Sequence, residues 1–398
     1  PYTNDWLNYI TPSEVEFLPW HRSYNQDILI MGNSFMKPII SYLQKRPIHL
    51  LLLAVPLSLL AEVFQWQPIW IFGFSAIAVI PLAALIGDST EAMAAYMGPK
   101  IGGLLNATLG NAAELIITIM AIRQGLLELV KASITGSIIG NLLLVMGLSM
   151  LLGGLKNGVQ KFDRQQSANH AVMLVVVIVA LIIPSFFSHS IGKEGSWGVE
   201  SLSLGVAGVM IALYIVGLIY TLKVAKSPIA VAAFELENEG HHRWKPSRAV
   251  VILALSTFGV VIMSEFLVGS VEEVVVSLGV SEFFLGVILI PLIGNIAEHL
   301  VSVTVALRNN MDLSLEIAVS SSLQIALFVA PLLVFISLLI GNPLTLIFNR
   351  FELLALGGGV VIAAMVAFDG ESNWLEGAAL LGVYLILGIG FFLLPTGG

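Results

Sequence analysis

The sequence contains no cysteine, which excludes disulfide bonds, thiolate metal sites and cysteine nucleophiles. It also has little charge: only 11% of its 398 residues are charged, whereas soluble domains usually carry about 25%. The net charge of −8 argues against nucleic acid as a partner. No His-Glu-x-x-His pattern occurs, and no Gly-x-Ser-x-Gly motif lies at mid-span beside a basic partner. An enzyme is therefore not expected, and no cofactor is indicated.

Hydrophobic residues make up 57% of the chain, and the mean hydropathy is +0.93. These values predict an all-α polytopic protein whose partner is the lipid bilayer. Its 37 glycines suit membrane helices whose backbones approach one another closely. Eleven apolar stretches are long enough to span: 48–64, 69–96, 101–122, 132–153, 168–188, 201–222, 248–276, 282–307, 314–340, 352–368 and 375–394.

The order of these stretches predicts five regions. They are a polar N-terminal segment (1–36), an unpaired first span (37–66), a first five-helix unit (67–222), a linker (223–247) and a second five-helix unit (248–398). The first thirty residues lack the apolar core of a secretory signal. The linker is expected to be a solvated connection, with cation sensing as the alternative.

Lysine and arginine are distributed unevenly between the predicted loops. The N-terminal segment and every second loop hold 14 of the 18, and the opposite side holds only Arg123, Lys131, Lys193 and Arg350. Because cytoplasmic loops carry the excess of Lys and Arg, the N-terminus is predicted to be cytoplasmic. With eleven spans, the C-terminus then lies outside.

One polar motif occurs twice inside apolar runs. Gly110-Asn-Ala-Ala-Glu114-Leu-Ile-Ile-Thr118 returns 184 positions later as Gly294-Asn-Ile-Ala-Glu298-His-Leu-Val-Ser302. In a helix, the Asn, the Glu and the final hydroxyl residue of each copy share one face. A carboxylate near the middle of a membrane span is costly and usually serves an ion, a proton or a substrate. Two such carboxylates in matching positions indicate a function.

The match extends beyond the motif without a gap. Glu128 falls on Asp312 and Ser137 on Ser321, while Thr90-Glu91 resembles Ser264-Glu265 after a longer loop is allowed in the second copy. Because each unit has five spans, an odd number, the second must enter the membrane from the opposite side. The sequence thus predicts two inverted five-helix repeats with a site near the midplane. Local helix breaks are expected at Gly110-Asn111 and around Pro291 and Gly294-Asn295.

The repeated residues suit a hard divalent cation such as Ca²⁺, which prefers six to eight oxygen ligands. The predicted metal site comprises Glu114, Glu298, Asn111, Asn295, Ser137, Ser321 and Gln324, with interhelical hydrogen bonding as the alternative role of the serines and Gln324. Two glutamates neutralise one divalent ion, and a buried glutamate without its cation should take up a proton. Glu91 and Glu265 are candidates for a proton relay or entrance. His299 is either another proton carrier or a packed neutral side chain.

These motifs resemble the two alpha-repeat signatures of the cation/proton exchanger (CAX) family, within the cation/calcium exchanger superfamily. Ser320-Ser-Ser-Leu-Gln-Ile-Ala-Leu-Phe-Val-Ala-Pro331 and Asp369-Gly-Glu-Ser-Asn-Trp-Leu-Glu376 are also similar to CAX sequence. The resemblance runs from about residue 40 to 394. It implies Ca²⁺/H⁺ antiport through eleven spans, with central glutamates at Glu114 and Glu298 and a flanking pair at Glu91 and Glu265. Gly140-Asn141 departs from the family, where many members have Ser-Asn.

The resemblance implies Ca²⁺ as the transported substrate, exchanged for H⁺ by alternating access. A Na⁺/Ca²⁺ exchanger of the same fold is the first alternative and a cation channel the second, although channels more naturally use symmetric oligomeric rings. Transport of other divalent cations and assembly into a homo-oligomer stay open. Since the linker is only modestly acidic and the termini are short, the plasma membrane of a prokaryote is favoured over a vacuolar membrane.

Overall fold

The computed structural model describes residues 47–223 and 244–394. The chain forms two compact units that divide between Leu50 and Leu51. The predicted N-terminal segment 1–36, the beginning of the first-span region 37–66 and nearly all of the linker 223–247 lie outside the described residues.

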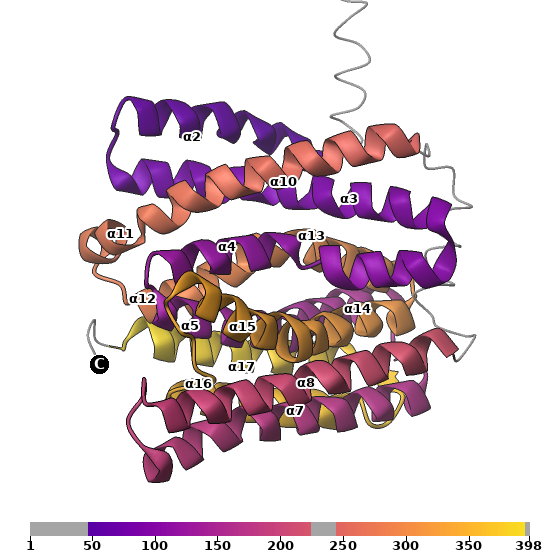
Figure 1. The fold of residues 1–398 in the computed structure, drawn as a ribbon. Helices are drawn as coiled ribbons and strands as arrows, with labels where there is room; N and C mark the ends of the chain where they lie inside the picture. The colour runs from indigo at the N-terminus through magenta and orange to yellow at the C-terminus, as the bar shows by residue number, and fades with distance from the viewer. Residues whose placement is uncertain (1–46, 224–243, 395–398) are drawn as a thin grey trace, which may run out of the picture. The chain divides into compact units, whose positions relative to one another are not determined.

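The segment of residues 47–223 is mostly helical, with one short strand (Figure 1). Its elements are η1 (Pro47–Leu53), α2 (Ala54–Val63), α3 (Pro68–Leu109), α4 (Ala112–Arg123), α5 (Leu127–Ile139), the π-helical turn η2 (Gly140–Val145), α6 (Met146–Asn157), β1 (Gln160–Lys161), α7 (Arg164–Ile191) and α8 (Trp197–Lys223).

The part after the linker is also mostly helical, with one short strand. Its elements are α10 (Pro246–Gly269), α11 (Val271–Leu278), α12 (Glu282–Phe284), the π-helical turn η3 (Leu285–Leu289), α13 (Ile290–Leu307), α14 (Met311–Gln324), the π-helical turn η4 (Ile325–Val329), α15 (Ala330–Ile340), α16 (Arg350–Val366), β2 (Glu371–Ser372) and α17 (Trp374–Phe392).

The prediction of a mostly helical membrane protein is confirmed. Among the described residues, eight helices are long and apolar enough to cross a membrane. The predicted first span corresponds to a shorter apolar helix over Ile48–Val63. Two other predicted spans are short in the structure, because α4 has 12 residues and α16 has 17. The count of eleven spans therefore stays a prediction.

Helix breaks lie partly where the sequence places them. The predicted span 101–122 is interrupted at Gly110–Asn111, where Asn111 leaves the helical region with φ −93° and ψ 18°. An unexpected break at Ser270 divides the predicted span 248–276 into α10 and α11, as Gly-Ser pairs often do. The predicted break at Gly294–Asn295 is wrong, because α13 continues through it. The irregularity lies earlier, in η3, just before Pro291.

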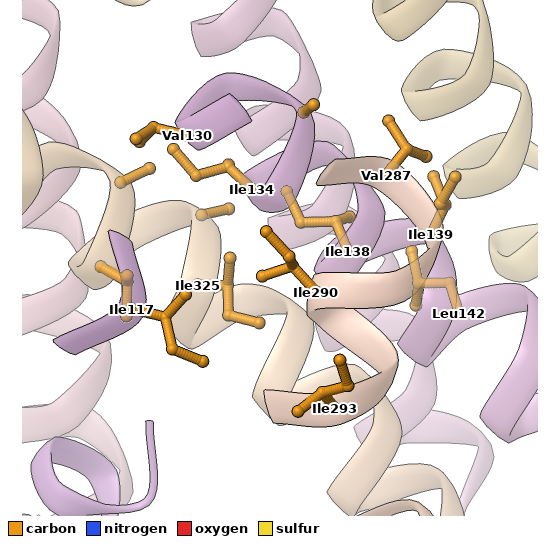
Figure 2. Close-up of a cluster of buried hydrophobic side chains, with 14 of the residues drawn as sticks. Ile117, Val130, Ile134, Ile138, Ile139, Leu142, Val287, Ile290, Ile293 and Ile325 are labelled. Carbon is orange, nitrogen blue, oxygen red and sulfur yellow. The ribbon is translucent and has the colours of Figure 1, made fainter. Parts of the chain in front are cut away.

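The centre of the larger unit is built on α5, in which every residue from Leu129 to Ile139 is buried. Figure 2 shows isoleucines of α5 among apolar side chains of α4, α13 and η4. Glycine allows unusually close contact here: a Cβ atom on Gly136 would lie only 2.0 Å from the carbonyl oxygen of Val287. Such close backbone packing is typical of membrane helices with small residues.

This core has two opposite ends, each named after a core helix that begins there. At the α14 end, where α14 and α7 begin, β1 pairs antiparallel with β2 through Gln160 and Ser372. At the α5 end, where α5, α12 and α16 begin, Thr345 Oγ1 donates to Glu194 Oε1 over 2.5 Å. Connections from the two halves of the chain therefore meet at both ends.

Candidate functional site

Glu114 lies in the first turn of α4, directly after the break at Asn111, and only 4% of its surface is exposed. Ser137 Oγ of α5 donates to Glu114 Oε1 over 3.1 Å. Asn295 Nδ2 of α13 donates to the same serine oxygen over 3.2 Å and to the Pro291 carbonyl oxygen over 3.1 Å. Because a carbonyl can only accept, the Asn295 amide has a fixed direction, and the Ser137 proton must go to Glu114.

Glu298 occupies the corresponding place on α13 but is only half-buried. Ser321 Oγ of α14 donates to Glu298 Oε2 over 2.5 Å. Ser321 follows Glu298 by 23 positions, as Ser137 follows Glu114. Each central glutamate therefore accepts from a serine on the next core helix of its own half.

The two motif glycines bring the halves together. A Cβ atom on Gly294 would lie 2.9 Å from Cγ of Glu114, and one on Gly110 would lie 3.6 Å from Oε1 of Glu298. Each glycine thus lies against the glutamate of the other motif. A larger side chain at Gly294 would push on the Glu114 side chain. The glycines at which helix breaks were expected therefore also let the two motifs approach each other.

Two asparagines present unused polar atoms in this region. Asn111 Nδ2 donates to Gln324 Oε1 over 2.7 Å, which leaves Asn111 Oδ1 buried without a partner among the described residues. Asn141 Nδ2 in η2 is buried without a partner in the same part of the chain. The sequence interpretation missed Asn141. Its signal was the Gly140-Asn141 pair, which aligns with Gln324-Ile325 in the second half.

The predicted flanking residues have different surroundings. Glu91 on α3 and Glu265 on α10 are exposed, whereas Glu114 is buried. His299 is buried, and its Nε2 has no partner among the described residues. Thr118 donates to its own helix at Glu114 O over 2.7 Å, and Ser302 contacts Ser149 and Ser314 instead of Glu298.

The assembled groups are two carboxylates, amides and hydroxyls, which are neutral or anionic oxygen donors suited to a hard cation. Within residues 47–223 and 244–394, no group of three or more His, Asp or Glu side chains is placed to hold a metal ion. A cation at this site would therefore depend on only two charged ligands, with neutral oxygens completing its shell.

Comparison with known proteins gives consistent matches. Residues 67–223 and 248–393 match the model of the family described as sodium/calcium exchanger protein. A Ca(2+)/H(+) antiporter of Aphanothece halophytica is 44% identical over 358 residues, covering 87% of this chain and 96% of that protein. The Ca(2+)/H(+) antiporter ChaA of Bacillus subtilis is 41% identical, covering 85% and 97%. The solved structure of native YfkE has a TM-score of 0.76 at 39% identity, covering 87% and 100%.

Proposed function

Since this chain belongs to the sodium/calcium exchanger protein family, we propose that it exchanges Ca²⁺ for H⁺ across a membrane. Relatives named as Ca(2+)/H(+) antiporters cover nearly the whole chain at 40–44% identity, which supports the resemblance to proton-coupled exchangers. The protein is a transporter and not an enzyme, and Ca²⁺ is its substrate. No cofactor belongs to this activity.

The observation that carries the proposal is the pair of glutamates held by equivalent serines and approached by glycines from the opposite motif. Glu114 and Glu298 would bind the cation, with Asn111, Asn295, Ser137, Ser321 and Gln324 as neutral ligands or supports. Two carboxylates neutralise one divalent ion. Two protons neutralise the same pair when the ion has left, so both states avoid an uncompensated buried charge.

We further propose the layout that the sequence predicts: an unpaired first span and two inverted five-helix repeats, with the N-terminus in the cytoplasm. The α14 end would then face the cytoplasm and the α5 end the outside. Bacterial relatives with the same printed activity support a prokaryotic plasma membrane. Transport of other divalent cations and a homo-oligomeric state are predictions within this proposal.

Access to the site would alternate between the two sides. Glu91 lies inside α3 and Glu265 lies near the end of α10, and these two helices pack against each other. Both side chains are exposed and could receive ions at opposite entrances. His299, next to Glu298, is a candidate proton carrier. The motion should be a sliding of packed helices, because exposed backbone is prohibitive in lipid.

Transport in everted membrane vesicles tests the function directly. An imposed pH gradient should drive Ca²⁺ uptake, and a sodium gradient alone should not. Uptake that follows sodium and ignores pH would replace the proposal with Na⁺/Ca²⁺ exchange.

A further inference from the structure

A cleft between α7, α14 and α16 lies at the α14 end of the core and contains groups that the proposed transport site does not use. Asp163 and Asp312 line it with exposed side chains, and its wall includes His170 of α7 and Glu316 of α14. Only 7% of Glu316 is exposed. A carboxylate buried this deeply is costly unless its oxygens are paired, so its partners decide how firmly the two helices are joined.

Two side chains of α7 contact Glu316. Gln166 Nε2 donates to Glu316 Oε2 over 2.6 Å. His170 Nδ1 lies 3.6 Å from the same oxygen, and the two form an ion pair only when the imidazole is protonated. Histidine is the side chain whose charge ordinarily changes between pH 5 and 8. The hydrogen bond from Gln166 therefore needs no added proton, whereas the attraction of His170 depends on one.

The other charged groups beside the cleft are engaged elsewhere. The Asp163 carboxylate caps the first turn of α7, Asp312 accepts from the backbone N–H of Asp163, and Arg164 Nε donates over 3.1 Å to a backbone carbonyl just after α16. The two remaining helices that pack against α7 bring no charge to this point. Helix α16 lines the cleft with alanines, and α8 has no charged residue between Glu200 and Lys223, while its tyrosines stay neutral between pH 5 and 8.

Helix α14 connects this cleft with the proposed transport site. It is one unbroken α-helix. Ser321, five residues after Glu316, donates to Glu298 Oε2. Gln324, the last residue of the same helix, accepts from Asn111. A shift of α14 against α7 would therefore move side chains that hold both copies of the motif.

The corresponding contact at the α5 end has no histidine. There α16 packs against α5, and Glu352 takes the place of Gln166, since each is the third residue after the N-cap of its helix. Thr135 Oγ1 of α5 donates to Glu352 Oε1 over 3.4 Å. The nearby cation, Lys131, pairs with Glu128 over 2.5 Å, and a lysine keeps its charge between pH 5 and 8. Of these two corresponding contacts, the one at the α14 end is the one that depends on a histidine proton.

We propose that His170 and Glu316 form a pH-dependent clasp, which fixes α14 against α7 when the α14 side is acidic and frees it when that side is alkaline. The protonated imidazole and the buried carboxylate attract each other. Loss of the imidazole proton removes this attraction and leaves the hydrogen bond from Gln166. The clasp slows exchange at acid pH because α14 carries Ser321. This role in exchange rests on the proposed antiport, whereas the clasp itself does not.

A cysteine reporter in the purified protein, in detergent and without Ca²⁺, tests the clasp. Val319→Cys places a thiol on α14 at a buried position that lines the cleft, in a chain with no other cysteine. At pH 5.5, His170→Gln should accelerate labelling by a maleimide about fivefold, as expected for a coupled charge pair. At pH 8.5 it should leave labelling unchanged. Each comparison uses the same thiol at the same pH, so the pH dependence of the thiol reaction cancels.

Two further variants separate the ion pair from simple packing. Glu316→Gln removes the charge and keeps the shape, so it should also accelerate labelling at pH 5.5, and His170→Gln should add nothing in its background. His189→Gln removes another histidine of α7, which contacts the Ser185 carbonyl oxygen of its own helix, and should leave labelling unchanged. The clasp is refuted if His170→Gln acts equally at both pH values, has no effect at pH 5.5, or still acts in the Glu316→Gln background.

Exchange in everted vesicles, whose α14 side faces the medium in the proposed orientation, tests the role of the clasp. Initial Ca²⁺ uptake is measured at saturating Ca²⁺, which suppresses competition at the central glutamates, while the external pH is raised from 5.5 to 8.5 at a constant pH difference. Uptake by the native chain should accelerate at least about threefold more than uptake by His170→Gln. Equal pH dependence would remove the clasp from exchange. Absence of uptake by the native chain would instead contradict the antiport and leave the labelling result intact.

Discussion

The two copies of the motif have the same residues at their centres and different surroundings. Glu114 is buried and accepts from Ser137, which in turn accepts from Asn295, so a directed chain of hydrogen bonds starts at Asn295 and ends at Glu114. Glu298 is half-buried and has the single hydroxyl of Ser321. The comparison teaches that a repeated motif can place its two carboxylates in different hydrogen-bond surroundings.

The difference arises from residues outside the motif. Gln324 in the second half accepts from Asn111, whereas Gly140 in the corresponding place offers no side chain to Asn295. Asn295 bonds instead to Ser137. In an exchanger, the two halves of the site must open in turn. The different hydrogen bonds around Glu114 and Glu298 make the two halves unequal, which is a physical basis for opening one half at a time.

Neutralising either central glutamate should have the largest effect on transport. Glu114→Gln and Glu298→Gln keep the shape of the side chain but leave one fixed charge to balance a divalent ion. Both should abolish Ca²⁺-dependent proton movement, a loss of at least about a hundredfold. The measurement is fluorescence quenching of a pH dye in everted vesicles. Near-normal exchange in either variant would remove that glutamate from the site.

Removing the serine hydroxyl should affect the two copies of the motif unequally. Ser137→Ala removes the donor of Glu114 and also one acceptor of Asn295, whereas Ser321→Ala removes a single contact. The free energy of a hydrogen bond to a charged group is about 1.5–3 kcal/mol. We expect Ca²⁺ affinity to fall by about tenfold or more in Ser137→Ala and by less in Ser321→Ala, measured by isothermal titration calorimetry. Equal losses of Ca²⁺ affinity in the two variants would indicate that the additional hydrogen bond from Asn295 to Ser137 contributes nothing to binding.

The smallest effect is expected from giving the first half a polar side chain at the place that corresponds to Gln324. Gly140→Ser introduces a hydroxyl where nothing lies within 4 Å of a Cβ atom, and Gly140 has ordinary helical angles. The variant should fold normally and change Ca²⁺ affinity by less than about threefold, in the range of a single exposed hydrogen bond. A loss of transport would show that the space beside Asn141 must stay empty.

Much of this arrangement could be predicted from the sequence. The doubled motif pairs Glu114 with Glu298, and the same spacing pairs Ser137 with Ser321, although the sequence did not indicate that each serine would donate to its glutamate. The break at Asn111 follows from a Gly-Asn pair inside an apolar helix. These features depend on local periodicity and on repetition, which a single sequence contains.

Features that depend on contacts between distant elements were not predictable. The break at Ser270 and the continuity of α13 past Asn295 depend on how each helix packs, because the Asn295 side chain finds its acceptor within α13.

The central claim is that Ca²⁺ and protons compete for Glu114 and Glu298. Isothermal titration of the purified protein with Ca²⁺ between pH 6 and pH 8.5, in buffers of different ionisation enthalpy, measures affinity and released protons together. Competition predicts that affinity rises with pH, by up to about tenfold per unit for each displaced proton, and that binding releases protons. A Kd that stays constant over this range, with no proton release, would contradict the shared site.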